Sequence, residues 1–307
     1  MSVQIRASKQ QETFSSKKEK CGAGFPDRRE LDTTMLSLCR SGLDASDQDN
    51  SLLAAVSHHF SSGGGRVRAG LAYASARAYH LSHGEGLHLA ACCELLHNAS
   101  LIHDDIQDKD TMRRGKSSLW AKYGRNRAIC AGDLLLSAAY AALAELQNLN
   151  PALIREVHQA TARIIAGQDA DLDYRPGDIQ DFSQYENIVE GKAAALLILA
   201  LELPMIQAGA SENNRQTARQ AARHFGIGYQ MLDDLADFNE DDHAESQRFN
   251  AVSILMDLQG LDRTTAGEKI TDKALAHLAT TETLTAEFPE TIRNPFMALV
   301  RNYKSGL

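Results

Sequence analysis

Two aspartate clusters with the same spacing of carboxylates carry the clearest chemistry in this chain. The first reads Asp104-Asp105-Ile106-Gln107-Asp108 and the second reads Asp233-Asp234-Leu235-Ala236-Asp237. Each follows an apolar, helix-prone run, so carboxylates at i and i+4 are expected on one face of a helix. Two such faces opposed across a cavity would hold more negative charge than a fold tolerates unless divalent cations lie between them. The repetition predicts a metal cluster and, through the metals, a polyanionic substrate.

The ligand type indicates which metal this would be. Hard carboxylate oxygens select Mg²⁺ or Mn²⁺, which retain waters and bridge phosphate oxygens. A calcium loop of the EF-hand type would need a Gly at its sixth position and a Glu at its twelfth, and neither is present. An isolated charge run is usually a solvated acidic face, but the residues before each cluster are too apolar for that. The predicted metal ligands are Asp104, Asp105, Asp108, Asp233, Asp234 and Asp237.

Helical spacing extends each cluster into a longer stripe. The first stripe is acidic at one end and small or apolar at the other, as expected of a deep pocket with metals at its mouth; it contains Cys93, His97, Ser100, Asp104 and Asp108. The second stripe contains Gly226, Gln230, Asp233 and Asp237.

Basic residues should converge on the phosphates that the metals leave exposed. Arg113 and Arg114 follow the first cluster. Arg66 and Arg68 follow the triple glycine Gly63-Gly64-Gly65. Lys192 shares a predicted helix with Tyr185 and Ile188. The flexible glycine backbone could place its N–H groups near an anion. Each basic residue taken alone is more often a surface charge than a ligand.

Composition limits the class of protein. A formal charge of −8 argues against a nucleic-acid binder, which needs a basic footprint. The five cysteines show no zinc-ligand spacing and are expected to be reduced thiols in a cytoplasmic protein. No apolar run reaches the ~18 residues of a membrane span, and the polar N-terminal segment has no apolar core of a secretory signal.

The distribution of proline, alanine and leucine favours an all-α chain. None of the six prolines lies between residues 27 and 150, and alternating β-branched stretches are scarce. We expect residues 1–29 to form a disordered tail. Residues 30–307 are expected to form one helical domain of roughly ten or more helices.

The motifs together resemble those of the trans-isoprenyl diphosphate synthases, or polyprenyl synthetases. The resemblance runs from the glycine-rich segment to about Leu255 and is carried by Gly63–Arg68, His97–Asp105, Met112–Gly115, Ala131–Asp133, Gly167-Gln168 with Asp171, Tyr185 to Lys192, and Tyr229–Asp234. It implies an isoprenoid synthase fold, in which helices surround a deep central cavity. It also implies a homodimer that joins an allylic diphosphate to isopentenyl diphosphate with, in all, three Mg²⁺ ions.

The resemblance further implies a role for individual residues. Asp104, Asp105 and Asp108 would bind two metals, and Asp233 with its partners a third. Arg113 and Lys192 would hold the allylic diphosphate, and Gln230 would face its pocket. Arg68, His97 and Arg114 would hold isopentenyl diphosphate. Small residues before the first cluster, Ala99 and Ser100, with Leu96 deeper, imply a pocket open to products of C20 or longer, unless neighbouring helices or a partner subunit close it.

Some positions depart from the family pattern. Gly65 stands where the family has a lysine, Ala193 replaces a threonine, and no lysine follows the second cluster until Lys269. Losing one charge-assisted phosphate contact costs about 1.5–3 kcal/mol. Three readings therefore stay open: a prenyl-elongating transferase, a terpene cyclase or other enzyme that ionises an allylic diphosphate without isopentenyl diphosphate, and a non-catalytic regulatory subunit.

Overall fold

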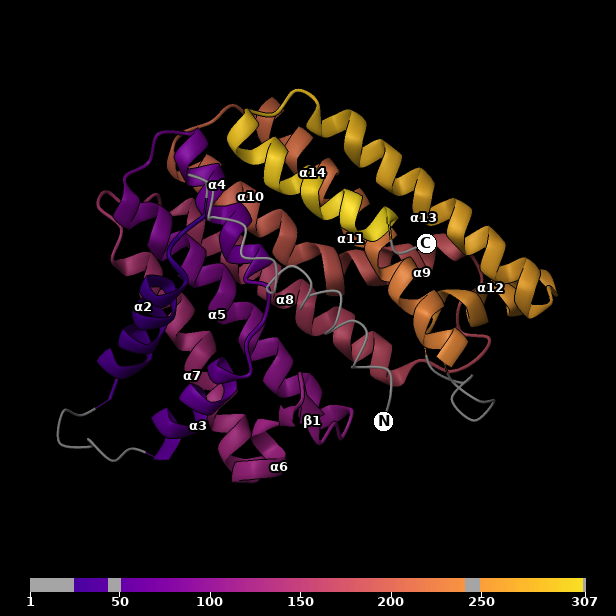
Figure 1. Ribbon diagram of the computed structural model, residues 1–307, viewed down its shortest axis with the longest axis horizontal. Helices are drawn as coiled ribbons and strands as arrows, with labels where there is room; N and C mark the ends of the chain where they lie inside the picture. The colour runs from indigo at the N-terminus through magenta and orange to yellow at the C-terminus, as the bar shows by residue number, and fades with distance from the viewer. Residues whose placement is uncertain (1–24, 44–50, 241–248, 306–307) are drawn as a thin grey trace. The chain divides into compact units, whose positions relative to one another are not determined.

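The structure, a computed structural model, describes residues 25–43, 51–240 and 249–305, and these are helical along most of their length (Figure 1). The predicted all-α fold is confirmed. The predicted tail lies outside the described residues up to residue 24, and its boundary was placed too late, because a helix already begins at Arg28. The described residues group into two compact units, whereas the composition showed no boundary. Helices α8 and α10 each contribute residues to both units.

The first unit comprises the described residues up to Arg155 together with Leu203–Gly209. Its elements are α2 (Arg28–Ser41), α3 (Ser51–Ser61), α4 (Val67–Ala78), α5 (His83–Gln107), β1 (Met112–Arg113), β2 (Lys116–Ser117), α6 (Leu119–Tyr123), α7 (Arg125–Ala144) and the start of α8 (Ala152–Asp173). The long helix α5 packs against α4 and α7 (Figure 1). It is buried on nearly all sides from Gly86 to Ile102, as expected of a core helix.

The short hairpin of β1 and β2 was not predicted. Met112 pairs with Ser117 and Arg113 with Lys116, so Arg114 and Gly115 form the two-residue turn. Both turn residues have positive φ, 50° and 76°. A turn of this kind matches the twist of the strands and favours glycine at its second position. The hairpin therefore fixes the direction of Arg113 and Arg114 immediately after the first aspartate cluster.

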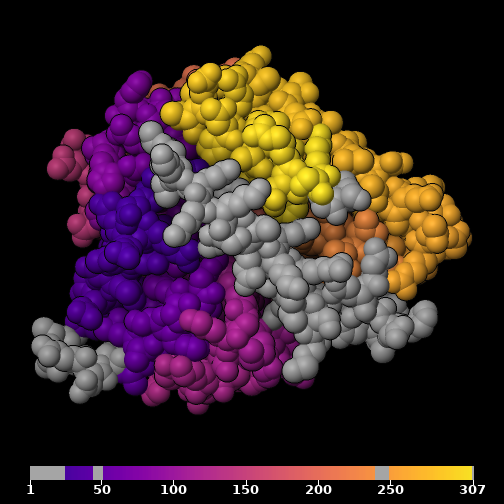
Figure 2. Space-filling view, in the orientation of Figure 1, coloured from indigo at the N-terminus to yellow at the C-terminus, as the bar shows by residue number. Residues whose placement is uncertain are grey.

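The second unit comprises Glu156–Glu202 and the described residues from Ala210 onward. After most of α8 come α9 (Phe182–Val189), a π-helical turn η1 (Glu190–Ala194), α10 (Ala195–Gln207), α11 (Glu212–Glu240), α12 (Ala251–Gln259), α13 (Arg263–Thr285) and α14 (Glu290–Lys304). Helix α13 buries one stripe, Ala266, Ile270, Ala274, Leu278 and Thr281, and packs along α11. Figure 2 shows the outer surface of α13 and α14 in yellow-orange tones.

Glycines allow close helix contacts in the second unit. A Cβ on Gly226 of α11 would lie 2.7 Å from Cα of Ala194 in η1, and a Cβ on Gly228 would lie 3.0 Å from the carbonyl oxygen of Ala274 in α13. The first distance is too short for any side chain, and the second is tighter than most Cβ contacts. Helix α11 can therefore approach η1 this closely only because residue 226 is glycine, and a Cβ at residue 228 would require a small shift of α13.

One helix in the described part of the chain, α7, is long and apolar enough to cross a membrane by length and composition alone. The sequence reading had found no run of this length, because Arg125, Arg127 and Asp133 interrupt the helix. Its buried residues, from Ala128 to Leu143, pack in the core of the first unit. A helix buried in a protein core can have the length and composition of a membrane span.

Candidate active site

The first aspartate cluster lies at the C-terminal end of α5. Asp108 caps the helix, with its backbone N–H donating to the carbonyl oxygen of Asp104 at 2.8 Å. Asp104 is half-buried and Asp108 is exposed. Carboxylates here add to the partial negative charge of the helix C-terminus, where anions are disfavoured. This end of α5 therefore suits a bound cation, and its hard oxygen donors suit Mg²⁺.

Asp105 lies apart from Asp104 and Asp108 because it pairs with Arg113. Its side chain is 1% exposed, and the Arg113 Nη2 nitrogen lies 2.6 Å from its Oδ1. The Arg113 Nε donates to both carboxylate oxygens at 2.9 Å. Burial raises the pKa of the Asp105 carboxyl, and the hydrogen bonds from Arg113 oppose that rise. The structure thus favours a positioning role for Asp105, and its direct ligation of a metal stays a prediction.

Arg114 reaches from the hairpin to the loop between α3 and α4. Its Nη1 donates to the carbonyl oxygen of Gly63, and its guanidinium occupies the space that a Cβ on Gly64 would need. Burial, and then the neighbouring Arg113 charge, lower the pKa of Arg114 to about 10. The structure therefore brings two predicted groups together, the arginine pair and the triple glycine.

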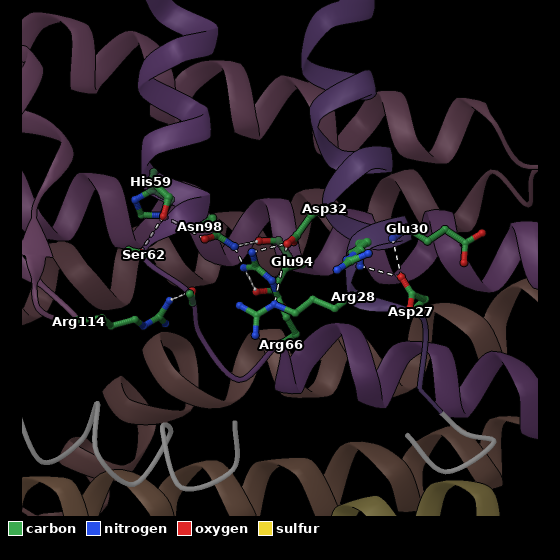
Figure 3. A network of polar contacts seen from close by, with 12 residues as sticks. Asp27, Arg28, Glu30, Asp32, His59, Ser62, Arg66, Glu94, Asn98 and Arg114 are labelled. Atoms are coloured by element: carbon green, nitrogen blue, oxygen red, sulfur yellow. Dashed lines mark hydrogen bonds and ion pairs between the residues drawn. The ribbon is translucent and has the colours of Figure 1, made fainter. Parts of the chain in front are cut away.

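Arg66 belongs to a buried polar network rather than to an open site (Figure 3). Its side chain is 8% exposed, with Nη1 3.0 Å from Glu94 Oε1 and Nη2 2.8 Å from Asp32 Oδ1. Glu94 also accepts from Asn98, whose amide oxygen lies 3.0 Å from Nε2 of His59. The predicted contact of Arg66 with substrate is therefore not favoured, because both of its terminal nitrogens already bind carboxylates.

Arg68 and His97 are close together, as their shared predicted role requires. The Arg68 Nη1 lies 3.2 Å from Nε2 of His97. Burial, followed by the charge of Arg68, lowers the pKa of His97 well below its ordinary value. The imidazole is therefore neutral, with Nε2 accepting from Arg68 and the proton on Nδ1. The pair offers N–H donors and one positive charge to an anion.

The predicted pocket-floor residues Leu96, Ala99 and Ser100 lie on α5, the helix that carries Asp104. Leu96 and Ala99 are 4% and 1% exposed, and the half-buried Ser100 donates its hydroxyl to the carbonyl oxygen of His97 at 2.9 Å. All three residues precede Asp104 on the same helix. A deep cavity lined by these residues stays a prediction.

In the second unit, α11 carries the second aspartate cluster. Asp234 is 6% exposed and accepts at 2.8 Å from the Tyr185 hydroxyl, the Gln230 amide and the Ala251 backbone N–H. Burial raises the pKa of Asp234, and these donors oppose the rise. Asp234 therefore fastens α9 and α12 to α11. Its predicted ligation of a metal, like the predicted contact of Gln230 with substrate, stays a prediction.

The Asp233 carboxylate has fewer hydrogen-bond donors than Asp234 to offset the cost of its burial. Burial raises the pKa of its carboxyl to about 8, the Tyr229 hydroxyl opposes the rise, and the nearby Asp237 and Asp234 charges add to it. A cation would relieve this cost, so Asp233 and Asp237 fit a hard metal ion. Within residues 25–43, 51–240 and 249–305, no three His, Cys, Asp or Glu side chains converge as a preformed metal centre. A single cluster thus supplies only part of a coordination shell.

Lys192 lies in the π-helical turn η1, not in the regular helix that its spacing from Tyr185 and Ile188 predicted. Its ammonium pairs with Asp171 of α8. The two elements meet at glycines, because a Cβ on Gly167 would lie 2.9 Å from the backbone nitrogen of Lys192. A π-turn often marks a functional position, and here it places the lysine beside a carboxylate whose charge also raises the pKa of Asp234.

Sequence reasoning missed Asp32, His59, Glu94 and Asn98 as structural partners of the site. One signal was available, since Glu94 lies in the apolar run Cys92-Cys93-Glu94-Leu95-Leu96. A buried carboxylate requires a cationic partner. The identity of that partner could not be read from the sequence, because Arg66 is distant along the chain.

The comparisons with known proteins agree with these motifs. The polyprenyl synthetase family model matches residues 49–251. A (2E,6E)-farnesyl diphosphate synthase of Mycobacterium tuberculosis is 33% identical over 173 residues, covering 56% of this chain and 48% of the relative. A short chain isoprenyl diphosphate synthase of Methanothermobacter thermautotrophicus is 30% identical over 246 residues, covering 77% and 74%. The matched part thus spans about half the length of the mycobacterial relative and about three quarters of the archaeal one.

Solved structures share the fold. A geranylgeranyl pyrophosphate synthetase from Geoglobus acetivorans superposes with a TM-score of 0.77 at 22% identity, covering 90% of this chain and 97% of that one. A decaprenyl diphosphate synthase from Rhodobacter capsulatus gives 0.76 at 22% identity, covering 91% and 96%. Because the family model covers more than half of this chain, the protein belongs to the polyprenyl synthetase family.

Proposed function

We propose that this protein is a prenyltransferase that condenses an allylic diphosphate with isopentenyl diphosphate to give a longer trans-polyprenyl diphosphate. The observation that carries the proposal is the Asp105–Arg113 pair, which joins the first aspartate cluster to the arginine pair. It holds a guanidinium beside the carboxylates that would bind metal, so a diphosphate could contact both. Membership of the family supports the same reaction class.

Each residue has a proposed part in this reaction. Asp104, Asp108 and Asp233 would hold Mg²⁺, with Mn²⁺ as a substitute, and the metal would supply charge stabilisation to the departing diphosphate. Arg113 and Lys192 would bind that diphosphate, while Arg68, His97 and Arg114 would bind isopentenyl diphosphate. Cleavage of the allylic C–O bond leaves a carbocation, and the double bond of isopentenyl diphosphate attacks it. The carbocation that results loses a proton to form the new double bond, and the released diphosphate takes that proton.

Product length is proposed to be C20 or longer. The small, buried Ala99 and the half-buried Ser100 leave no aromatic side chain on α5 immediately before Asp104. The relatives bear names of both shorter and longer synthases, farnesyl and nonaprenyl among them. Chain length therefore rests on α5 alone, and a product series that stops at C15 would overturn it.

The test is an incubation of purified protein with Mg²⁺ and geranyl or farnesyl diphosphate, with and without isopentenyl diphosphate. Extension that requires isopentenyl diphosphate supports the proposal. Diphosphate release with a hydrocarbon or alcohol product in its absence would instead support a cyclase or hydrolase. That alternative is motivated by Gly65 and by the absence of lysine between Lys192 and Lys269. If the protein turns over neither substrate mixture by itself but changes the activity of an active synthase mixed with it, a regulatory subunit would be supported. A homodimer and a cytoplasmic location stay predictions.

A further inference from the structure

The turn Gly63-Gly64-Gly65, here called the glycine turn, lies among several arginines of the first unit. Gly63 and Gly64 have φ values of 85° and 126°, which side chains rarely adopt. A backbone without side chains at these positions lets an anion approach the main chain closely. Arg114 already contacts the turn through the carbonyl oxygen of Gly63.

A second guanidinium, that of Arg28, lies beside the same turn and has no role in the arrangement described above. Its Nη2 lies 3.7 Å from the position that a Cβ on Gly63 would take. The side chain is 46% exposed, and its Nε lies 3.9 Å from Oδ2 of Asp32. Arg66 makes the closer contact with that carboxylate, at 2.8 Å (Figure 3). Asp32 is therefore shared, and it neutralises Arg28 only weakly.

The backbone at Arg28 is held firmly. Arg28 is the first residue of α2, and Asp27 caps the helix by accepting from the backbone N–H groups of Arg29 and Glu30 at 2.8 and 3.0 Å. The Phe25 ring occupies the space next to Gly70 of α4 that a Cβ would need. The start of α2 is thus fixed against α4, the helix that follows the glycine turn.

Guanidinium groups gather around the turn. In the part of the chain that the structure describes, those of Arg28, Arg66, Arg68 and Arg114 lie near one another and interact with the carboxylates of Asp32 and Glu94. His97, which contacts Arg68, is neutral and contributes no charge. Several guanidinium groups around a glycine backbone fit an anion with oxygens on several sides.

We infer that Arg28 is a further substrate-binding residue, which holds the diphosphate of isopentenyl diphosphate at the glycine turn together with Arg114. This inference rests on the proposed function, since it assigns a cation to the same second-substrate site. Its alternative is a purely structural Arg28 that forms an i,i+4 pair with Asp32 on α2.

The test compares Arg28→Ala and Arg28→Lys with Arg29→Ala, a matched control that removes the adjacent exposed arginine. Losing one charge-assisted contact should raise the KM for isopentenyl diphosphate about tenfold in Arg28→Ala. The KM for the allylic diphosphate should stay within about twofold. Arg28→Lys should keep part of the affinity, and Arg29→Ala should match the wild type in both constants.

A variant that supplies the lost positive charge from another position sharpens the test. Gly65 is the one glycine of the turn without a positive φ, and a Cβ there would meet only a methyl group of Val67, at 3.3 Å. A lysine is therefore accommodated with a small adjustment. Gly65→Lys in the Arg28→Ala background should restore the affinity for isopentenyl diphosphate, whereas Gly65→Ala in that background should not.

The outcomes separate the two proposals. If the wild type extends a chain and Arg28→Ala leaves the KM for isopentenyl diphosphate unchanged, the role of Arg28 is overturned and the function stands. If Arg28→Ala raises both KM values equally or lowers Tm, a structural role is indicated and the inference is likewise overturned. If the wild type does not extend chains, the proposed function fails. Calorimetric binding of inorganic pyrophosphate to wild type and Arg28→Ala then decides whether Arg28 binds a diphosphate.

Discussion

The Arg113 guanidinium donates from Nε to both oxygens of the buried Asp105 carboxylate, each at 2.9 Å, and from Nη2 to Oδ1 at 2.6 Å. Three donor contacts fix both the position and the plane of the guanidinium. Asp105 and Arg113 are therefore held in place by each other. Changing either residue should affect the other.

The first prediction concerns this ion pair. Asp105→Asn removes the buried negative charge that neutralises the Arg113 guanidinium. The free energy of unfolding should therefore fall by about 3 kcal/mol. The KM for the allylic diphosphate should rise because the guanidinium is less well oriented. Urea unfolding and steady-state kinetics measure both effects. Asp108→Asn, at an exposed position, should unfold at nearly the wild-type urea concentration; equal midpoints for all three proteins would contradict the structural role of the pair.

The second prediction concerns metal binding. Asp104→Ala should abolish turnover, because it removes one of the two carboxylates that share a helical face at the end of α5 and would bind the metal. Treatment of the wild type with a chelator should have the same effect, and Mg²⁺ should restore activity. Mg²⁺ with inorganic pyrophosphate should raise Tm in the wild type and not in Asp104→Ala. Asp272→Asn, an exposed carboxylate on α13, is the control, and near-normal turnover in Asp104→Ala would refute the metal assignment.

Periodicity made the helices and the placement of the clusters predictable. Asp104 and Asp108 lie together at the end of α5, and Asp233 and Asp237 lie together on α11, because residues at i and i+4 share a helical face. The roles of Asp105 and Asp234 were not predictable in the same way. Each is fixed by a partner on another element, Arg113 in one case and Tyr185 in the other.

Short or irregular elements escaped the sequence for a different reason. Strands β1 and β2 have two residues each, too few for an alternating pattern. The Arg114-Gly115 pair was a usable turn signal only in combination with a neighbouring strand pattern. Arg66 was assigned to the substrate because basic residues near glycine often bind anions, whereas its burial depends on Asp32 and Glu94, which no local pattern connects to it.

The third prediction uses two glycine-to-alanine substitutions with opposite expected signs. Gly226→Ala would bring a methyl group within 2.7 Å of Cα of Ala194, so α11 must move away from η1. The expected cost is about 2 kcal/mol. Gly84→Ala, near the start of α5, meets nothing within 4 Å and should be neutral or stabilise by up to ~1 kcal/mol. Urea denaturation of both variants measures the difference, and a stabilised Gly226→Ala would show that this helix contact is loose.

The fourth prediction concerns acid stability. His59 is buried and donates to Asn98, and burial, followed by the Arg113 and Arg114 charges, lowers its pKa to about 3. In the unfolded chain the imidazole binds a proton near pH 6.5, whereas in the folded chain it binds one only near pH 3. Stability should therefore fall as pH decreases through that window, by up to about 1.4 kcal/mol per pH unit from this group.

His59→Gln keeps an N–H donor without the titration, so its free energy of unfolding should depend less steeply on pH between 6 and 4. His158→Gln, at an exposed position on α8, is the control and should follow the wild-type slope. Parallel profiles for all three proteins would mean that His59 protonates as readily in the fold as in the unfolded chain.

The π-turn η1 has a consequence for how this chain can vary. Such a turn accommodates one residue more than a regular helix of the same height, and it holds Lys192 while Gly191 lies against α8. Deleting a single residue from Glu190–Ala194 would let a regular α-helix run from α9 into α10. The side chains of α9 and α10 would keep their orientation relative to one another, because the π-turn already absorbs the extra residue. A one-residue deletion in this stretch would therefore remove the turn that holds Lys192 without changing the register of α10.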